Sequence, residues 1–269
     1  MNIGIVGGGY VGQGLKRFFL GQGFQPVVYD VNAEVSDVES IFSLNAFDLD
    51  FAYICVPTPM KENGECNISI VADCVQKIKA KTVVIKSTVP PGTTDRLGSL
   101  YNKSILFTPE YFGETKNHPL NDFATRNFHV IGGRPEVRVR LVELYRDIYQ
   151  ANVKFHLCTS KEAEIIKYME NCFLAMKVTF VEEFQRICWA HGVDYWNVRE
   201  GWLMDPRVNP SHTFPGKDGE PGFGGKCLPK DISAIIESTR SHNYNPEFLM
   251  AMVNFNTNMR EACKKEQKG

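Results

Sequence analysis

The sequence predicts an α/β fold, with a doubly wound parallel sheet in its first part and an all-helical second part. Short β-branched runs alternate with helical periodicity up to about residue 150, a glycine-rich turn follows the first run, and long helical stretches begin at Thr159. Strands that alternate with helices are typical of a parallel sheet covered on both faces. We expect strands at Ile3–Val6, Pro26–Tyr29, Phe51–Val56, Thr82–Lys86, Ile105–Phe107, Phe128–Ile131 and Val153–Leu157.

The composition argues against several classes of protein. The 269 residues include 30 Lys and Arg against 31 Asp and Glu, and this formal charge of −1 gives no basic surplus for binding nucleic acid. An apolar fraction of 43% excludes disorder as the main state. No apolar run approaches the roughly 18 residues of a membrane span. The N-terminus has no features of a secretion signal, so we expect a cytoplasmic protein.

The predicted division into domains falls near residue 158. Residues 1–158 hold the alternating pattern, and residues 159–269 hold the helices. Thr159-Ser160 is a suitable N-cap, with Glu162 and Glu164 in the first turn of the helix that follows. An irregular stretch from Met204 to Lys226 is rich in Pro and Gly, and ordered loops of that length are usually functional.

A glycine-rich turn, Gly7-x-Gly9-x-x-Gly12, directly follows the first expected strand. The first glycine allows a tight bend, the second lets a pyrophosphate approach the backbone, and the third lets helix and strand pack closely. Asp30 ends the second strand, where a carboxylate can accept from a ribose hydroxyl and would repel a 2′-phosphate. The pattern favours a Rossmann domain that binds NAD over an ordinary glycine turn.

Three polar loops follow successive strands of the predicted sheet. They are Cys55–Pro59, Ser87–Thr94 and Pro109–Glu114. The carboxyl ends of parallel strands meet at the edge where such sheets bind ligands. Each loop alone could be a simple strand exit, but three in succession indicate a site.

The helix that begins near Ser160 is apolar on two sides, which predicts burial between domains. One face has Ile165, Met169, Cys172, Phe173, Met176 and Phe180, and the other has Ala163, Leu174, Val178 and Val181. Lys167 and Asn171 lie within the second face. The lysine either extends its ammonium to solvent or holds it in a cleft where it can neutralise an oxyanion.

One of the eight cysteines has an unusual setting, in Gly222-Phe223-Gly224-Gly225-Lys226-Cys227-Leu228-Pro229-Lys230-Asp231. The glycines permit close approach of a ligand, and the two lysines favour a thiolate. The spacing does not match a phosphate-binding GxxxxGK[ST] loop. No cysteine or histidine cluster has zinc spacing, so we expect no metal, and the other cysteines are expected to be buried.

Together these motifs resemble the UDP-glucose/GDP-mannose dehydrogenases, the NAD-dependent four-electron dehydrogenases of nucleotide sugars. The resemblance covers GxGxxG with Asp30, VPTP, KSTVPPGTT, PE-x-x-x-E, AEIIKYMENCFLA and GFGGKCLPKD, in that order. The last motif, with the DPR…PG-x-DG loop before it, looks most like the UDP-glucose branch.

The resemblance implies a mechanism in which UDP-glucose becomes UDP-glucuronate through a thiohemiacetal and a thioester on Cys227. Lys167 and Asn171 match residues that stabilise the negative oxygen, Asp231 and Thr88 match a pair that orders water, and Glu114 matches a general base. The implied cofactor contacts are Gly7, Gly9, Tyr10, Val11, Gly12, Asp30, Val56, Pro57, Thr58, Thr88, Glu114 and Lys230. The implied substrate contacts are Glu110, Tyr111, Phe112, Gly113, Lys167, Asn171, Phe223, Gly224, Gly225 and Cys227.

The chain departs from this family at its end, because family members usually continue into a further domain that binds much of the nucleotide. A separate chain or a dimer mate could supply that part, the substrate could be smaller, or the chain could be an inactive NAD-binding remnant. A short β-hydroxyacid dehydrogenase is a further alternative, but its chemistry needs no thiol. The helical half is rich in Trp, Phe and Met, and the family forms dimers through this region, so we expect a homodimer.

Overall fold

The computed structural model describes residues 1–112, 120, 122–216 and 220–266. Its strands are β1 (Ile3–Val6), β2 (Val27–Tyr29), β3 (Leu49–Ile54), β4 (Ala80–Ile85), β5 (Ile105–Phe107), β6 (Phe128–Gly132) and β7 (Lys154–Cys158). Its α-helices are α1 (Tyr10–Gly21), α2 (Ile41–Leu44), α3 (Ser69–Lys77), α4 (Thr93–Tyr101), α5 (Pro135–Ile148), α6 (Ser160–Ala190), α7 (Tyr195–Trp202), α8 (Leu228–Arg240) and α9 (Glu247–Glu266). Two short 3-10 helices are η1 (Ala33–Val35) and η2 (Asn45–Phe47). All seven expected strands are present, with bounds that shift by at most two residues.

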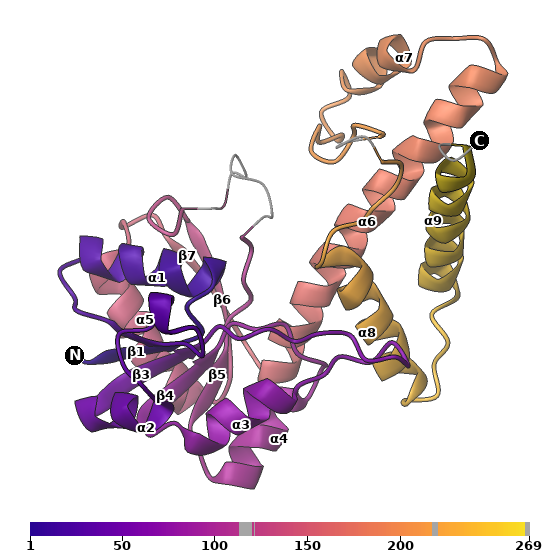
Figure 1. Ribbon diagram of the computed structural model, residues 1–269. Helices are drawn as coiled ribbons and strands as arrows, with labels where there is room; N and C mark the ends of the chain where they lie inside the picture. The colour runs from indigo at the N-terminus through magenta and orange to yellow at the C-terminus, as the bar shows by residue number, and fades with distance from the viewer. Residues whose placement is uncertain (113–119, 121, 217–219, 267–269) are drawn as a thin grey trace. The chain divides into compact units, whose positions relative to one another are not determined.

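The seven strands form one sheet in the order β2-β1-β3-β4-β5-β6-β7 (Figure 1). Neighbouring strands are parallel except β5 and β6, which pair antiparallel through Phe107 and Gly132. The predicted doubly wound sheet is therefore confirmed, with one antiparallel pair that the alternation of elements did not indicate. The strand order reverses beside β1, and ligands of such sheets bind in the crevice outside the carboxyl ends of the strands at that point.

Apolar side chains on both faces of the sheet form the core of the first part of the chain. Phe18 and Phe19 of α1 and Leu141 of α5 pack on one face with alternate residues of β1 and β3. The other face is covered by α2, α3, α4 and the start of α6, where Ala163 and Ile166 lie. This two-sided burial explains why the central strands are almost continuously apolar.

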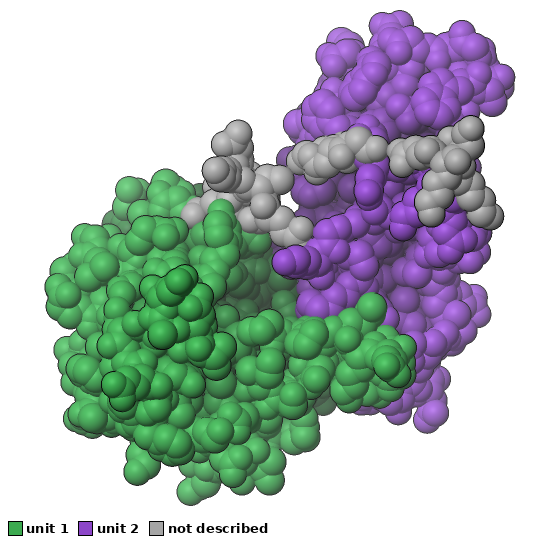
Figure 2. Space-filling view, viewed as in Figure 1, with its two compact units in different colours: residues 1–167 green, residues 168–269 purple. Residues whose placement is uncertain are grey.

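The chain divides into two compact units, residues 1–167 and 168–269 (Figure 2). The division falls inside α6, because the first turns of this helix pack on the sheet of the first unit. The expected cap of α6 is present: the backbone N–H of Thr159 donates to Glu162 at 2.7 Å, and the N–H of Glu162 donates to the Thr159 hydroxyl at 3.3 Å.

The second unit consists of helices with a small core of its own. Ile232 and Ile236 of α8 pack with Ala175 of α6 and Met252 of α9. None of the helices among the described residues is both long and apolar enough to cross a membrane.

The burial predicted for α6 is found in part on each face. On the second face Ala163 and Val181 are buried and Leu174 and Val178 are half-buried, and on the first face Cys172 is buried and Met176 is half-buried. On the first face, four residues are instead exposed, namely Ile165 at 45%, Met169 at 73%, Phe173 at 55% and Phe180 at 45%. These four side chains are therefore not covered by the part of the chain that the structure describes.

Gly132, at the end of β6, provides a test of how α6 packs on the sheet. A Cβ at this position would lie 2.5 Å from the Cβ of Ala163 and 2.8 Å from the carbonyl oxygen of Thr159. Gly132→Ala should therefore lower the free energy of unfolding by about 1 to 3 kcal/mol, measured by urea denaturation. Gly201→Ala, where a Cβ meets nothing within 4 Å, is the control and should be neutral or stabilising. Equal stability of the two variants would contradict this packing.

Candidate functional site

The turn between β1 and α1 has the geometry that a pyrophosphate needs. Gly7 has φ +100°, a left-handed conformation, and a Cβ at Gly12 would lie 1.9 Å from the carbonyl oxygen of Gly7. Gly9 is the N-cap of α1, no side chain caps the helix there, and a Cβ on Gly9 would meet nothing within 4 Å. The first N–H groups of α1 are therefore available to an anion.

Asp30 lies directly after β2 and is held by the backbone. Its Oδ2 accepts from the N–H of Gly8 at 2.6 Å, and its Oδ1 accepts from the N–H of Asn32 at 2.8 Å. These bonds fix the carboxylate beside the glycine turn, as required for a group that accepts from a ribose hydroxyl. Both the turn and the carboxylate thus fit NAD.

The loops after β3 and β4 are joined beside this turn. The hydroxyl of Ser87 donates to the carbonyl oxygen of Val56 at 2.6 Å. The thiol of Cys66 donates to the backbone carbonyl oxygen of Thr88 at 3.7 Å. Of the other predicted cofactor contacts, Tyr10 and Pro57 are exposed, Val11, Val56 and Thr88 are half-buried, and Thr58 is buried.

The loop after β5 is anchored by a buried ion network around Glu110. Oε2 of Glu110 lies 3.1 Å from Nζ of Lys86, and Oε1 accepts from Nη2 of Arg126 and from the N–H of Tyr111, each at 2.7 Å. Burial raises the pKa of Glu110, but the two cations and the hydrogen bonds outweigh it and lower the pKa to about 2. With its oxygens so occupied, Glu110 is suited to fixing the loop rather than to moving protons.

Tyr111 and Phe112 follow this anchor. The ammonium of Lys167 lies 5.2 Å from the centre of the Tyr111 ring, so the buried lysine does not extend its charge into solvent. The Phe112 ring lies 5.3 Å from that of Tyr10. Gly113 and Glu114, two further predicted site residues, lie outside the described residues.

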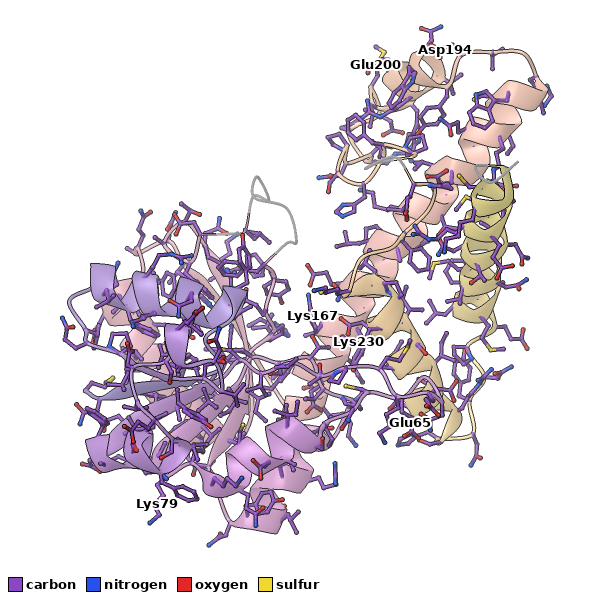
Figure 3. The ribbon with its side chains drawn as sticks, in the orientation of Figure 1. Glu65, Lys79, Lys167, Asp194, Glu200 and Lys230 are labelled. Carbon is purple, nitrogen blue, oxygen red and sulfur yellow. The ribbon has the colours of Figure 1, made fainter. Side chains whose placement is uncertain are left out.

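In the second unit, Asp231 links α8 to α6. Its Oδ2 accepts from Nδ2 of Asn171 at 2.5 Å, and its Oδ1 accepts from the ammonium of Lys230 (Figure 3 labels Lys230 on α8). Asp231 is only 2% exposed, so this network fixes the first turn of α8. The structure therefore brings three of the predicted residues together.

Cys227 occupies the N-cap position of α8 and is the one cysteine of the eight that is exposed. Cys55 and Cys263 are half-buried, and the other five are buried. Burial raises the pKa of Cys74 to about 11 and, with Asp231 nearby, that of Cys172 to about 12, so these thiols stay protonated at neutral pH. The exposure singles out Cys227 as the accessible thiol.

The segment before Cys227 is held by side chains of α6 and α9. Asn256 accepts from the N–H of Phe223 at 2.9 Å and donates to its carbonyl oxygen at 3.1 Å. The buried carboxylate of Glu182 accepts from the N–H of Gly222 at 2.8 Å. Gly224 packs against the guanidinium of Arg260, and Gly225 has φ +73°.

Sequence reasoning did not assign roles to Arg126, Glu182 and Asn256, and treated Glu164 only as a first-turn residue. Glu164 is fully buried and accepts from the N–H of Gly92 and from Thr94. No local pattern points to these residues, because each acts on a loop at least 16 residues away.

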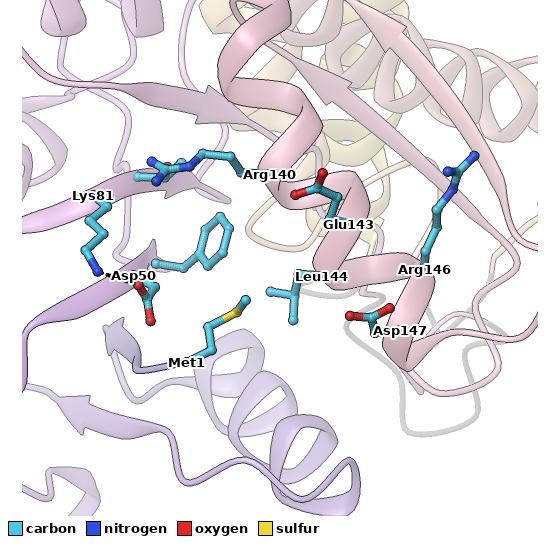
Figure 4. A pocket seen from close by; sticks show the side chains of 10 residues that line it. Met1, Asp50, Lys81, Arg140, Glu143, Leu144, Arg146 and Asp147 are labelled. Atoms are coloured by element: carbon cyan, nitrogen blue, oxygen red, sulfur yellow. Dashed lines mark hydrogen bonds and ion pairs between the residues drawn. The ribbon is translucent and has the colours of Figure 1, made fainter.

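A cavity of about 510 Å³ in the first unit lies away from these groups (Figure 4). It opens at the amino ends of β3 and β4, whereas ligands of such sheets bind at the carboxyl ends. Acidic and basic side chains both line it, and Lys81 pairs with Asp50 at 2.8 Å. Its lining residues are Met1, Asp50, Phe51, Lys81, Thr82, Arg140, Glu143, Leu144, Arg146 and Asp147.

Two family models match the chain. The NAD binding domain of the UDP-glucose/GDP-mannose dehydrogenase family matches residues 36–152, and the central domain of the same family matches residues 161–258. The chain belongs to this family of nucleotide-sugar dehydrogenases, and NAD is the cofactor of its first domain.

Individual relatives agree with this assignment. A UDP-glucose 6-dehydrogenase of Rickettsia prowazekii is 30% identical over 228 residues, which are 81% of this chain and 51% of the relative. The solved UDP-glucose dehydrogenase of Pyrobaculum islandicum has a TM-score of 0.82 and 27% identity, covering 95% of this chain and 68% of that one. A UDP-D-ManNAc dehydrogenase of Pyrococcus horikoshii shares the fold, with a TM-score of 0.81, 23% identity and coverage of 96% and 69%. The chain spans about half the length of the curated relatives it matches.

A substitution at Gly9 tests cofactor binding without disturbing the stability of the fold. Its φ of −72° is open to alanine and a Cβ there has free space, so Gly9→Ala should leave the free energy of unfolding within about 0.5 kcal/mol. The added methyl group would lie where the pyrophosphate approaches, so NADH affinity should fall by at least about tenfold in a fluorescence titration. Gly21→Ala, with equal free space, is the control. Unchanged NADH affinity in Gly9→Ala would refute this location.

Proposed function

We propose that the protein oxidises UDP-glucose to UDP-glucuronate with two molecules of NAD, through covalent chemistry on Cys227. The observation that carries this proposal is the exposed Cys227 thiol at the start of α8, one turn before the buried Asp231–Asn171 pair. A dehydrogenase that stopped at the aldehyde would need no nucleophile of this kind.

Each oxidation removes a hydride from carbon 6 and a proton from its hydroxyl group, and the proton passes to water. NAD, when bound, accepts the hydride that leaves carbon 6 in each of the two oxidations. The Cys227 thiolate adds to the aldehyde carbon of the first product, and the resulting thiohemiacetal loses the second hydride to leave a thioester. Water then breaks the carbon–sulfur bond, which releases the carboxylate and regenerates the thiol. A serine in this position would leave an ester that is harder to hydrolyse.

Five other residues have roles in the same proposal. Lys167 and Asn171 hold the negative oxygen of the alkoxide and tetrahedral species, since a buried ammonium and an amide N–H both stabilise developing negative charge. Asp231 and Thr88 order the attacking water, and Glu114 is the proposed base. The anchored loop after β5 and the Phe223–Gly225 segment bind the sugar nucleotide. Cytoplasmic location and a role in polysaccharide biosynthesis belong to the same proposal.

We also propose that two copies of the chain pair through α6. The exposed residues Ile165, Met169, Phe173, Phe180, Phe184 and Ile187 follow helical spacing, and we call them the α6 stripe. The Phe180 ring packs at a tilt against that of Phe184, with their centres 4.6 Å apart, and lies 5.8 Å from the ring of Trp202, which extends the apolar surface. Contiguous exposed apolar surface of this kind marks a protein interface.

The yield of NADH per sugar tests the covalent mechanism. Purified protein should produce two NADH per UDP-glucose consumed, and Cys227→Ser should lose this turnover, because an ester on serine is harder to hydrolyse than a thioester. Absorbance of NADH and chromatography of the sugar nucleotides measure the ratio. Cys263→Ser, a half-buried cysteine on α9, is the matched control and should keep two.

Two other NADH yields would contradict the covalent mechanism. One NADH per sugar, unaffected by Cys227→Ser, would leave the thiol without a catalytic role and indicate simple alcohol oxidation. NADH binding without any turnover would indicate a required partner chain or an inactive NAD-binding remnant.

The oligomeric state tests the α6 stripe. Light scattering at micromolar concentration should give a dimer mass, and Phe173→Glu should weaken dimerisation by at least about tenfold because it places a charge in an apolar interface. Gln185→Glu adds the same charge to α6 outside the stripe and should leave the dimer intact. A wild-type protein that is monomeric under these conditions would overturn the pairing.

A further inference from the structure

Glu164 makes an unusual set of contacts for a carboxylate in the first turn of a long helix. It is 0% exposed, and all of its described partners belong to the N-terminus of α4. Its Oε2 accepts from the N–H of Gly92 at 2.5 Å. Its Oε1 accepts from the N–H of Thr94 at 2.8 Å and from the Thr94 hydroxyl at 2.7 Å.

These contacts supply a cap that α4 lacks in its own sequence. The N-cap residue of α4 is Gly92, which has φ +89° and no side chain to accept a hydrogen bond. The first N–H groups of a helix have no partner within the helix and carry partial positive charge. Glu164 satisfies two of these backbone groups, which lie 72 and 70 positions before it in sequence.

The capped terminus is also the end of the loop that carries Thr88. β4 and the bond from Ser87 to Val56 hold the start of this loop, and Glu164 holds its end at Gly92. Only four residues lie between these anchors, two of them prolines, so the path of the loop depends on both anchors. Thr88, which lies between the anchors, is one of the predicted cofactor contacts.

We infer that Glu164 is a positioning residue that holds the Thr88 loop in its cofactor-binding conformation. This inference rests on the role proposed for Thr88, and it adds a residue that touches neither cofactor nor substrate. A carboxylate is the suitable group, because each oxygen faces a donor and an amide would direct its own N–H towards one of them.

The charge state of Glu164 makes its role measurable. Burial raises the pKa of Glu164 to about 7, against the lowering effect of the bonds from Thr94 and Gly92, and Asp95 of α4 adds to the rise. A lysine, Lys161, lies near this terminus, with its Cε 3.5 Å from a Cβ built on Gly92. Below pH 7 the carboxyl group gains a proton and loses one of its acceptor positions.

Protonation should loosen the loop without destabilising the fold. Because its pKa is raised, the folded chain binds this proton more tightly than the unfolded chain does. The contribution of Glu164 to the free energy of unfolding therefore increases as the pH falls from about 7 to 4.5, the ordinary pKa of a glutamate. A fall in NADH affinity over this range would therefore report the loop and not unfolding.

The test compares Glu164→Gln with Glu162→Gln. Glu162 is exposed and caps α6 itself through Thr159, so its variant alters the same helical turn without touching α4. At pH 8, Glu164→Gln should speed hydrogen exchange of the Gly92 and Thr94 amides and weaken NADH binding, each by about tenfold. Wild type should lose NADH affinity between pH 8 and pH 6, and Glu164→Gln should not. Glu162→Gln should behave as wild type.

Thr94→Val is a second variant, which tests the same contact if Glu164→Gln does not fold. Thr94→Val removes only the hydroxyl bond and should weaken NADH binding in the same direction by a smaller factor. Unchanged exchange at Gly92 and Thr94 in Glu164→Gln would overturn the inference, as would faster exchange with unchanged NADH affinity. If the expected binding results appear but UDP-glucose is not oxidised, the proposed function fails and the role of Glu164 stands.

Discussion

Loops of this protein that bear candidate site residues depend on buried carboxylates that accept hydrogen bonds from backbone N–H groups. Helix α6 supplies two of them: Glu164 holds the loop before α4, and Glu182 holds Gly216 and Gly222. Gly92, Gly216 and Gly222 all have positive φ, so their conformations are accessible mainly to glycine and need an external partner. A charged acceptor is stronger than a neutral one, and burial protects it from competition by water. Helix α6 therefore fixes the backbone at Gly92, Gly216 and Gly222.

Features determined by neighbouring residues could be predicted from the sequence. The glycine turn, the strand ends and the cap of α6 each depend on residues within a few positions, and the structure confirms them. The exposed setting of Cys227 follows from the same kind of local signal, because glycines and lysines surround it. The NAD-binding domain was predictable because its turn has a mechanical requirement at each glycine.

Features determined by distant partners could not be predicted. The sequence places Glu110 in a polar loop of the predicted site, but its pairing with Lys86 and Arg126 is set by the sheet and loop. The antiparallel direction of β6 leaves no mark on its apolar pattern. The apolar residues of the α6 stripe indicate burial against something, and sequence does not distinguish another part of the chain from a second copy.

The cap that Glu164 provides for α4 also affects the order in which the chain can fold. The bond to Gly92 joins residues 72 positions apart, so loop closure over β5, β6, α5 and β7 must come first. A helix of nine residues is marginal alone, and one that lacks its cap is weaker still. We therefore expect α4 to acquire its final stability late, after the ribosome has released the first turns of α6 and the sheet has formed around them.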